Sequence, residues 1–232
     1  VTNRTGFTIL HPLKGVVGER VDIVHTDGRK TKGRFPKLIS PGQPYFEIRS
    51  LTHQVMPGVT AKDMILHLIG ELGTAAGTGY SVEYAGSAVR ALSAEARLTL
   101  CNLTIEMGAR TGMVAPDDTT YEYLAGRDYA PKGAMWDRAV AHWRTLPSDP
   151  DAEFDREHTI DMKDVAPQIT WGTSPEHVIA VDRAIPDPHT GPEEKRGAWE
   201  AALRYQGLEP GKPIEGTPVD WVFIGSCTNS RI

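Results

Sequence analysis

The residue with the clearest chemical potential is Cys227, which follows a short apolar run. Residues 221–224 are all apolar and precede Gly225 and Ser226, so they predict a buried strand that ends in a turn just before the cysteine. In open α/β sheets, ligands bind beyond the carboxyl ends of the strands. A thiolate there could ligate a metal or act as a nucleophile, whereas a lone cysteine is more often a small buried hydrophobe. Spacing alone leaves both interpretations open, because no CxxC motif lies near Cys227.

A second candidate is the pair Asn102 and Glu106, which we expect on one helix. Ser93 is a typical N-cap for a helix that continues to about Met107. Because residues four apart share a helix face, the amide and the carboxylate could point at one ligand. By spacing alone, such a pair is more typical of a solvated helix face. The same pattern predicts that the helix packs through its apolar positions, which are Leu98, Cys101 and Ile105.

The elements that must position these residues alternate between strand and helix from residue 46 onward. Residues 46–51 alternate apolar and polar side chains, as a half-buried strand does. Thr60, with Asp63 three residues later, predicts the capped start of a helix that ends at Gly73. This alternation predicts a layered α/β fold, with α/β/α domains around a mixed or parallel sheet.

The order of these elements predicts two domains after an opening segment. Residues 147–151 are rich in turn formers and mark a boundary. We therefore expect a small α/β domain at 46–150 and the start of a second α/β domain at 151–232, which ends at the cysteine strand. Residues 1–45 contain several glycines and prolines with only short β-like runs, and they stay unassigned.

Composition argues against several classes of function. Of the 232 residues, 40% are hydrophobic and 24% are charged, which is typical of a soluble globular protein. The formal net charge of −5, without a basic stripe, argues against nucleic acid or an anionic membrane as a partner. No apolar run approaches the ~20 residues that span a bilayer. Two cysteines far apart in the sequence make no disulfide framework, so we expect a cytoplasmic protein.

Several motifs together resemble one enzyme family. The eight residues Gly225-Ser-Cys-Thr-Asn-Ser-Arg-Ile232 resemble the signature at which the aconitase superfamily places the first of three cysteine ligands to a 4Fe-4S cluster. Two further stretches, 130–133 and 167–175, resemble the large subunits of bacterial 3-isopropylmalate dehydratases within that superfamily. The resemblance covers about residues 46–232. Other motifs that match in the family's order are Pro57–Asp63, Gly77–Gly79, Val82–Gly86, Leu100–Gly108 and Met113–Tyr121.

This resemblance implies a hydro-lyase of leucine biosynthesis. Family enzymes isomerise 2-isopropylmalate to 3-isopropylmalate by removing water and returning it to the neighbouring carbon at the cluster. Cys227 would be a cluster ligand, Glu106 would hold the hydroxide, and Asn102 would contact the substrate or the cluster. The resemblance also implies a separate small subunit, which supplies a seryl base. A sister dehydratase, homoaconitase or aconitase, and a truncated product without catalysis are the alternatives.

The chain departs from the family pattern at both ends. Residues 1–45 contain no Asp-Ser-His-Thr-type loop, which the family has before the matching region. The family's other two cysteine ligands form a CxxC downstream of the Cys227 motif, and this sequence does not contain it. We therefore expect a fragment of a large subunit, one that on its own neither holds a cluster well nor turns over substrate.

Overall fold

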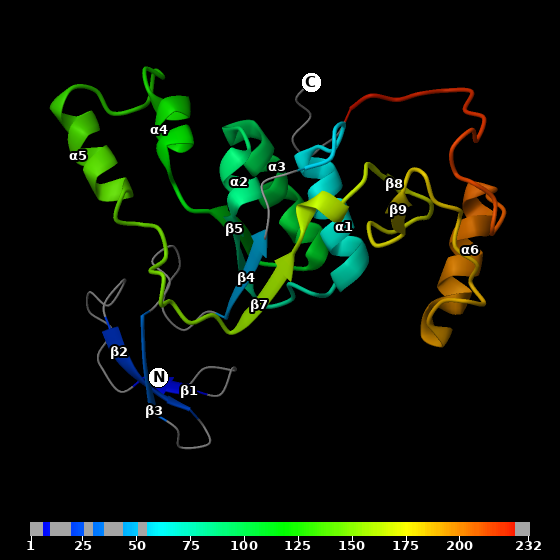
Figure 1. Ribbon diagram of the computed structural model, residues 1–232, viewed down its shortest axis with the longest axis horizontal. Helices are drawn as coiled ribbons and strands as arrows, with labels where there is room; N and C mark the ends of the chain where they lie inside the picture. The colour runs from blue at the N-terminus through cyan, green and yellow to red at the C-terminus, as the bar shows by residue number, and fades with distance from the viewer. Residues whose placement is uncertain (1–6, 10–19, 26–29, 35–43, 51–54, 226–232) are drawn as a thin grey trace.

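The computed structural model describes residues 7–9, 20–25, 30–34, 44–50 and 55–225. Its centre is a four-stranded sheet in the order β6-β5-β4-β7, in which every neighbouring pair is parallel. The strands are β4 (Tyr45–Ser50), β5 (Ser81–Gly86), β6 (Thr111–Val114) and β7 (Arg156–Ile160). Parallel neighbours require crossover connections, and helices supply these connections (Figure 1). The predicted α/β class is confirmed.

Helices cover one face of this sheet. They are α1 (Ala61–Leu72), α2 (Ser87–Ala91) and α3 (Ala94–Leu103), followed by the 3-10 helix η1 (Thr104–Met107). Alternate strand residues, Phe46 and Ile48 in β4 and Val82 and Tyr84 in β5, are buried in the core beneath α1 and α3. The apolar stripe of α1 faces the same core, as its spacing predicts. Its members Met64, Ile65, Leu68 and Ile69 are each at most 1% exposed.

The other face of the sheet is polar, and among the described residues it carries an irregular segment instead of packed helices. Glu47 and Glu83 are register partners on β4 and β5, and both are buried. Residues 147–154 lie over them, because Ser148 donates a hydrogen bond to Glu83 and the Phe154 ring stacks on Tyr45 at 5.2 Å. The helices of this connection, α4 (Asp118–Leu124) and α5 (Ala134–Trp143), extend away from the sheet (Figure 1). The expected α/β/α layering is thus incomplete on this side.

A second, smaller core follows β7. After the 3-10 helix η2 (Met162–Asp164), strands β8 (Gln168–Thr170) and β9 (Val178–Ala180) pair antiparallel, and η3 (Glu193–Lys195) leads into α6 (Arg196–Gln206). The core residues are Trp171, Ile185, Ala202, Leu203 and Ile214. A separate antiparallel sheet at the start of the chain contains β1 (Phe7–Ile9), β2 (Arg20–His25) and β3 (Lys30–Arg34).

Asp63 joins the first helix to the second core. One carboxylate oxygen accepts the N–H of Thr60 at 2.7 Å, which is the predicted acidic capping interaction. The other oxygen accepts the N–H of Gln168, also at 2.7 Å, from a position 105 residues away in sequence. A single side chain therefore fixes both the start of α1 and the start of β8.

The prediction of a buried strand at 221–224 is wrong for the structure of this chain. These residues form no strand, and their side chains are exposed, with Trp221 at 92% and Phe223 at 89%. An apolar strand is buried only where a sheet offers it neighbours, and no described strand pairs with this segment. Across the described residues, no helix combines the length and the apolar character needed to cross a membrane.

Candidate active site at the end of helix α3

The helix that carries Asn102 and Glu106 begins where the sequence predicts. Ser93 is its N-cap, and its hydroxyl accepts the N–H of Ala96 at 3.2 Å. The α-helix ends at Leu103, however, and the next four residues form the 3-10 helix η1. From Asn102 to Glu106 the chain makes two α-helical steps of about 100° and two 3-10 steps of about 120°, which is one full turn plus roughly 80°. In a continuous α-helix the two side chains would be only about 40° apart around the axis.

The 3-10 turn divides its residues cleanly between the core and the surface. In a 3-10 helix, residues three apart lie on the same side. Thr104 and Met107 are accordingly both 0% exposed, while Ile105 is 69% exposed and Glu106 is also exposed. Asn102, one turn earlier, is exposed as well. The two predicted site residues therefore both project from the surface, where a ligand could reach them.

A buried tyrosine anchors this turn from below. The hydroxyl of Thr104 donates to the carbonyl of Leu100 at 2.7 Å, so it can accept a hydrogen bond from Tyr84, whose hydroxyl lies 2.7 Å away. The Tyr84 hydroxyl is also 3.9 Å from the sulfur of Met107. Burial raises the pKa of Tyr84 well above its ordinary value, and the hydrogen bond with Thr104 offsets part of this rise. Tyr84 thus stays neutral and keeps its proton for donation.

Close backbone packing leaves the turn no room to move inward. A Cβ at Gly112 would lie 2.3 Å from Oγ1 of Thr104, so only glycine fits there without a shift. The N–H of Gly77 donates to the carbonyl of Met107 at 2.8 Å, and the N–H of Arg110 donates to Tyr80 at 2.9 Å. These bonds fasten η1 to the segments that precede β5 and β6. Asn102 and Glu106 therefore lie at the amino edge of the sheet.

The apolar positions of this helix are only partly as expected. Leu98 and Ile105 are exposed, at 39% and 69%, so their assignment to the packed face is wrong. The change to 3-10 geometry turns Ile105 outward. Cys101 is half-buried, and burial raises the pKa of its thiol to about 11. A partly buried, protonated thiol agrees with the packing role predicted for Cys101.

The third predicted residue, Cys227, lies outside the described residues. The structure therefore places Asn102 and Glu106 near each other on one surface and does not test their relation to the cysteine. No group of three His, Cys, Asp or Glu side chains that could hold a metal ion occurs within 7–9, 20–25, 30–34, 44–50 or 55–225.

A cavity of about 380 Å³ opens at the opposite, carboxyl edge of strands β4, β5 and β6. Glu47 and Glu83 line its floor, and Ser148 covers them. Arg49 binds Glu47 with two hydrogen bonds, at 2.8 and 3.0 Å, while Tyr45 and Ser148 both donate to Glu83. Burial raises the pKa of Glu47, and the Arg49 guanidinium opposes that shift. The buried carboxylates of the cavity floor are thus already hydrogen-bonded within the protein.

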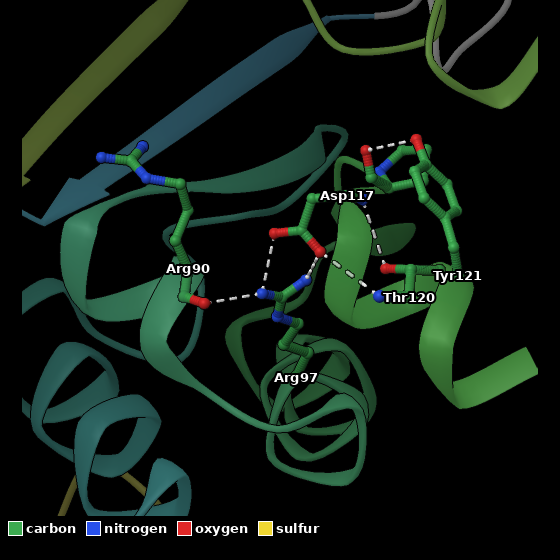
Figure 2. Close-up of polar contacts among 6 residues, drawn as sticks. Arg90, Arg97, Asp117, Thr120 and Tyr121 are labelled. Carbon is green, nitrogen blue, oxygen red and sulfur yellow. Dashed lines mark hydrogen bonds and ion pairs between the residues drawn. The ribbon is translucent and has the colours of Figure 1, made fainter. Parts of the chain in front are cut away.

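One ion pair at the rim of this cavity links three helices (Figure 2). Buried Arg97 in α3 binds the Asp117 carboxylate through two nitrogens, at 2.5 and 2.9 Å, and also donates to the Arg90 carbonyl at 2.8 Å. Asp117 is the N-cap of α4 and accepts the N–H of Thr120 at 3.3 Å. Burial favours the protonated form of Asp117, but the Arg97 guanidinium outweighs it and holds the pKa below the ordinary value.

The sequence interpretation missed the groups that support the site. Neither Tyr84 nor Arg97 was a candidate, because their roles depend on contacts between elements distant in sequence. Gly112 could have been found, since a glycine inside a strand pattern often marks a close backbone approach. His67 lies on helix α1. It is half-buried, with Nε2 3.7 Å from Glu71, and burial lowers its pKa against the pull of that carboxylate.

Two family models match this chain. The model of the aconitase family (aconitate hydratase) matches residues 46–232, and that of the N-terminal domain of D-apionate lactonase matches residues 1–70. The matches overlap at 46–70, where β4 and α1 belong to the parallel sheet and its core. The overlapping stretch is therefore structurally continuous with the remainder of the aconitase match.

A curated relative gives a more specific comparison. The 3-isopropylmalate dehydratase large subunit 1 of Bradyrhizobium diazoefficiens is 64% identical over 176 residues. The alignment covers 75% of this chain and 37% of the relative. The chain thus spans little more than a third of the length of that protein.

Proposed function

We propose that this chain, which belongs to the aconitase family, is part of the large subunit of a 3-isopropylmalate dehydratase. The observation that carries this proposal is the 64% identity to a large subunit of that name. The reaction would be the isomerisation of 2-isopropylmalate to 3-isopropylmalate by loss and return of water. Because the chain spans 37% of the relative, this activity belongs to the whole assembled enzyme.

Within that enzyme, Glu106 and Asn102 would act on the polar part of the substrate. The Glu106 carboxylate can accept hydrogen bonds from the departing hydroxide or water and present it to the neighbouring carbon. The Asn102 amide can both donate and accept, which suits a substrate carboxylate or hydroxyl. Both side chains are exposed, and Glu106 lies on a turn held by the buried Tyr84, which supports these roles. A fixed turn limits the conformations that must be ordered when substrate binds.

The family implies a 4Fe-4S cluster, and we propose Cys227 as one of its ligands because of its motif. The part of the chain that the structure describes does not make a cluster site by itself. It gathers no group of three potential ligands, and Cys101 is its only cysteine. Spectroscopy of a reconstituted enzyme carrying Cys227→Ala tests the ligand, since its cluster absorbance should fall relative to Cys101→Ala.

A small subunit is the proposed partner, and the cytoplasm is the proposed location. The words "large subunit" in the relative's name support a second chain. The resemblance assigns to that chain a seryl base, and to regions outside this sequence the arginines that bind the substrate carboxylates. The formal charge of −5 suits a small-molecule enzyme better than a protein that binds nucleic acid.

A hybrid enzyme tests this proposal. Residues 46–232 would replace the matching segment of the Bradyrhizobium large subunit, which would be produced with its small subunit. We expect the hybrid to isomerise 2-isopropylmalate, which is measured by the ultraviolet absorbance of the alkene diacid intermediate. Glu106→Gln should lower kcat by roughly a hundredfold or more, as loss of an acid-base group does. Glu200→Gln, an exposed carboxylate on α6, is the matched control and should leave kcat unchanged.

Two results would contradict the proposal. An assembled, cluster-loaded hybrid that converts citrate or homocitrate in preference to 2-isopropylmalate would favour a sister dehydratase. An assembled hybrid without any isomerase activity would favour a product that has lost catalysis.

A further inference from the structure

The turn that carries Glu106 also presents an apolar side chain to the surface. Ile105 is 69% exposed and directly precedes Glu106 in η1. A single exposed isoleucine is common on protein surfaces and needs no explanation by itself. This one shares its turn with the proposed hydroxide-binding carboxylate.

The outward position of Ile105 is fixed by the residues on either side. Thr104 and Met107 occupy the core side of the turn, and both are 0% exposed. Thr104 is bonded to Tyr84, and the carbonyl of Ile105 accepts the N–H of Gly108 at 2.8 Å. Rotating Ile105 into the core would displace Thr104, which already lies where a Cβ on Gly112 would clash. Ile105 is therefore held on the surface that Glu106 shares.

This surface carries both polar and apolar side chains, and the proposed substrate likewise has both polar groups and an apolar group. That substrate has polar groups, a hydroxyl and two carboxylates, and a branched alkyl group. Asn102 and Glu106 can serve only its polar groups. Ile105 is the exposed branched side chain directly beside Glu106, whereas exposed Leu98 lies near Asn102 and is eight residues, or about 12 Å along a helix axis, before Glu106.

We infer that Ile105 contacts the branched alkyl group of the substrate and helps select it among hydroxy-dicarboxylic acids. This inference rests on the proposed function. An apolar contact of this kind contributes equally to substrate and transition state, so its loss raises KM and changes kcat little. Discrimination by one or two methyl groups in an apolar contact is typically tenfold or more.

The test uses the hybrid enzyme and two substrates that differ only in the alkyl group, 2-isopropylmalate and 2-methylmalate. The measured quantity is the ratio of their kcat/KM values. Ile105→Ala should lower this ratio at least about tenfold, through KM for 2-isopropylmalate. Ile105→Val, which keeps a branched side chain and loses only one carbon, should lower the ratio less than Ile105→Ala does. Leu98→Ala, an exposed leucine on the same helix, is the matched control and should leave the ratio unchanged.

The alternative is that Ile105 packs against another part of the assembled enzyme. In that case Ile105→Ala lowers the melting temperature or the assembly with the small subunit while the substrate ratio stays constant, and the inference is overturned. If Ile105→Ala assembles poorly, Ile105→Thr, which keeps the branched shape, should still lower the ratio. A parent hybrid that assembles but isomerises neither substrate contradicts the proposed function instead, before any variant is made.

Discussion

The hydroxyl of Tyr84 lies 2.7 Å from Oγ1 of Thr104, so a buried strand residue holds the turn from which Glu106 projects. Both side chains are nearly or fully buried, at 2% and 0% exposure. The pair connects the central strand β5 to η1, which follows α3. The surface carrying Asn102 and Glu106 therefore depends on a contact in the core.

Tyr84→Phe should destabilise the protein and loosen this turn. The substitution removes one buried hydrogen bond and leaves Thr104 with its bond to Leu100 alone, which costs about 1 kcal/mol. In a chain of this size that corresponds to a fall in melting temperature of roughly 2–4 °C. Tyr205→Phe, at an 81% exposed tyrosine, is the control. Equal melting temperatures for the two variants would argue against the anchoring role.

Gly112→Ala should disturb the same turn by overpacking. The new Cβ would lie 2.3 Å from Oγ1 of Thr104 and 2.9 Å from the Cα of Cys101, and such overpacking typically costs about 1–3 kcal/mol. Gly197→Ala is the matched control, because nothing lies within 4 Å of a Cβ there and the residue is inside α6. The control should be neutral or slightly stabilising. Urea unfolding measures the free energy of unfolding of both variants. A Gly112→Ala variant as stable as the parent would show that the turn can shift to accommodate the new Cβ.

The Arg97–Asp117 pair predicts a pH-dependent contribution to stability. The folded-state pKa of Asp117 is held below the ordinary value of 3.8. Its contribution is therefore fully present above the unfolded-state pKa and is lost as pH falls through the folded-state pKa. Asp117→Asn should be clearly destabilising at pH 7, and the difference from the parent should shrink below about pH 4. Urea unfolding across this range checks it, with exposed Asp220→Asn as the control. A difference that stays constant with pH would contradict the ionic role.

The exposed apolar segment 219–224 should make the isolated chain self-associate. Val222 and Phe223 are 79% and 89% exposed, and neighbouring apolar residues extend the patch. Replacing both with serine should lower concentration-dependent light scattering without changing the melting temperature, since neither side chain is packed. Met135→Ser, at an isolated side chain that is 59% exposed, should leave scattering unchanged. Unaltered scattering of the double variant would place the association elsewhere.

The sequence predicted those features that depend on neighbours along the chain. The N-cap at Ser93, the capping interaction of Thr60 with Asp63, and the buried stripe of α1 all follow local rules, and all are confirmed. Predictions that depended on partners elsewhere were less successful. Residues 221–224 have the pattern of a buried strand, but burial also requires a neighbouring strand.

The candidate site shows the same division. Asn102 and Glu106 are candidates because of a motif, and the exposure of both is what a solvated helix face predicts. The outward turn of Ile105 was not foreseen, because a periodic pattern assumes α geometry throughout, whereas the chain tightens to a 3-10 helix at Thr104. The anchoring by Tyr84 involves a partner 20 residues away, which no local rule indicates.

The two bonds of Asp63 have a consequence for how the protein opens. Its carboxylate holds the amides of Thr60 and Gln168, which are far apart in sequence. When the first turn of α1 frays, Asp63 moves with it, and the amide of Gln168 loses its acceptor at the same moment. The two amides should therefore exchange their hydrogens with solvent in a single opening event, so that the helix start and the β8–β9 hairpin form one cooperative unit.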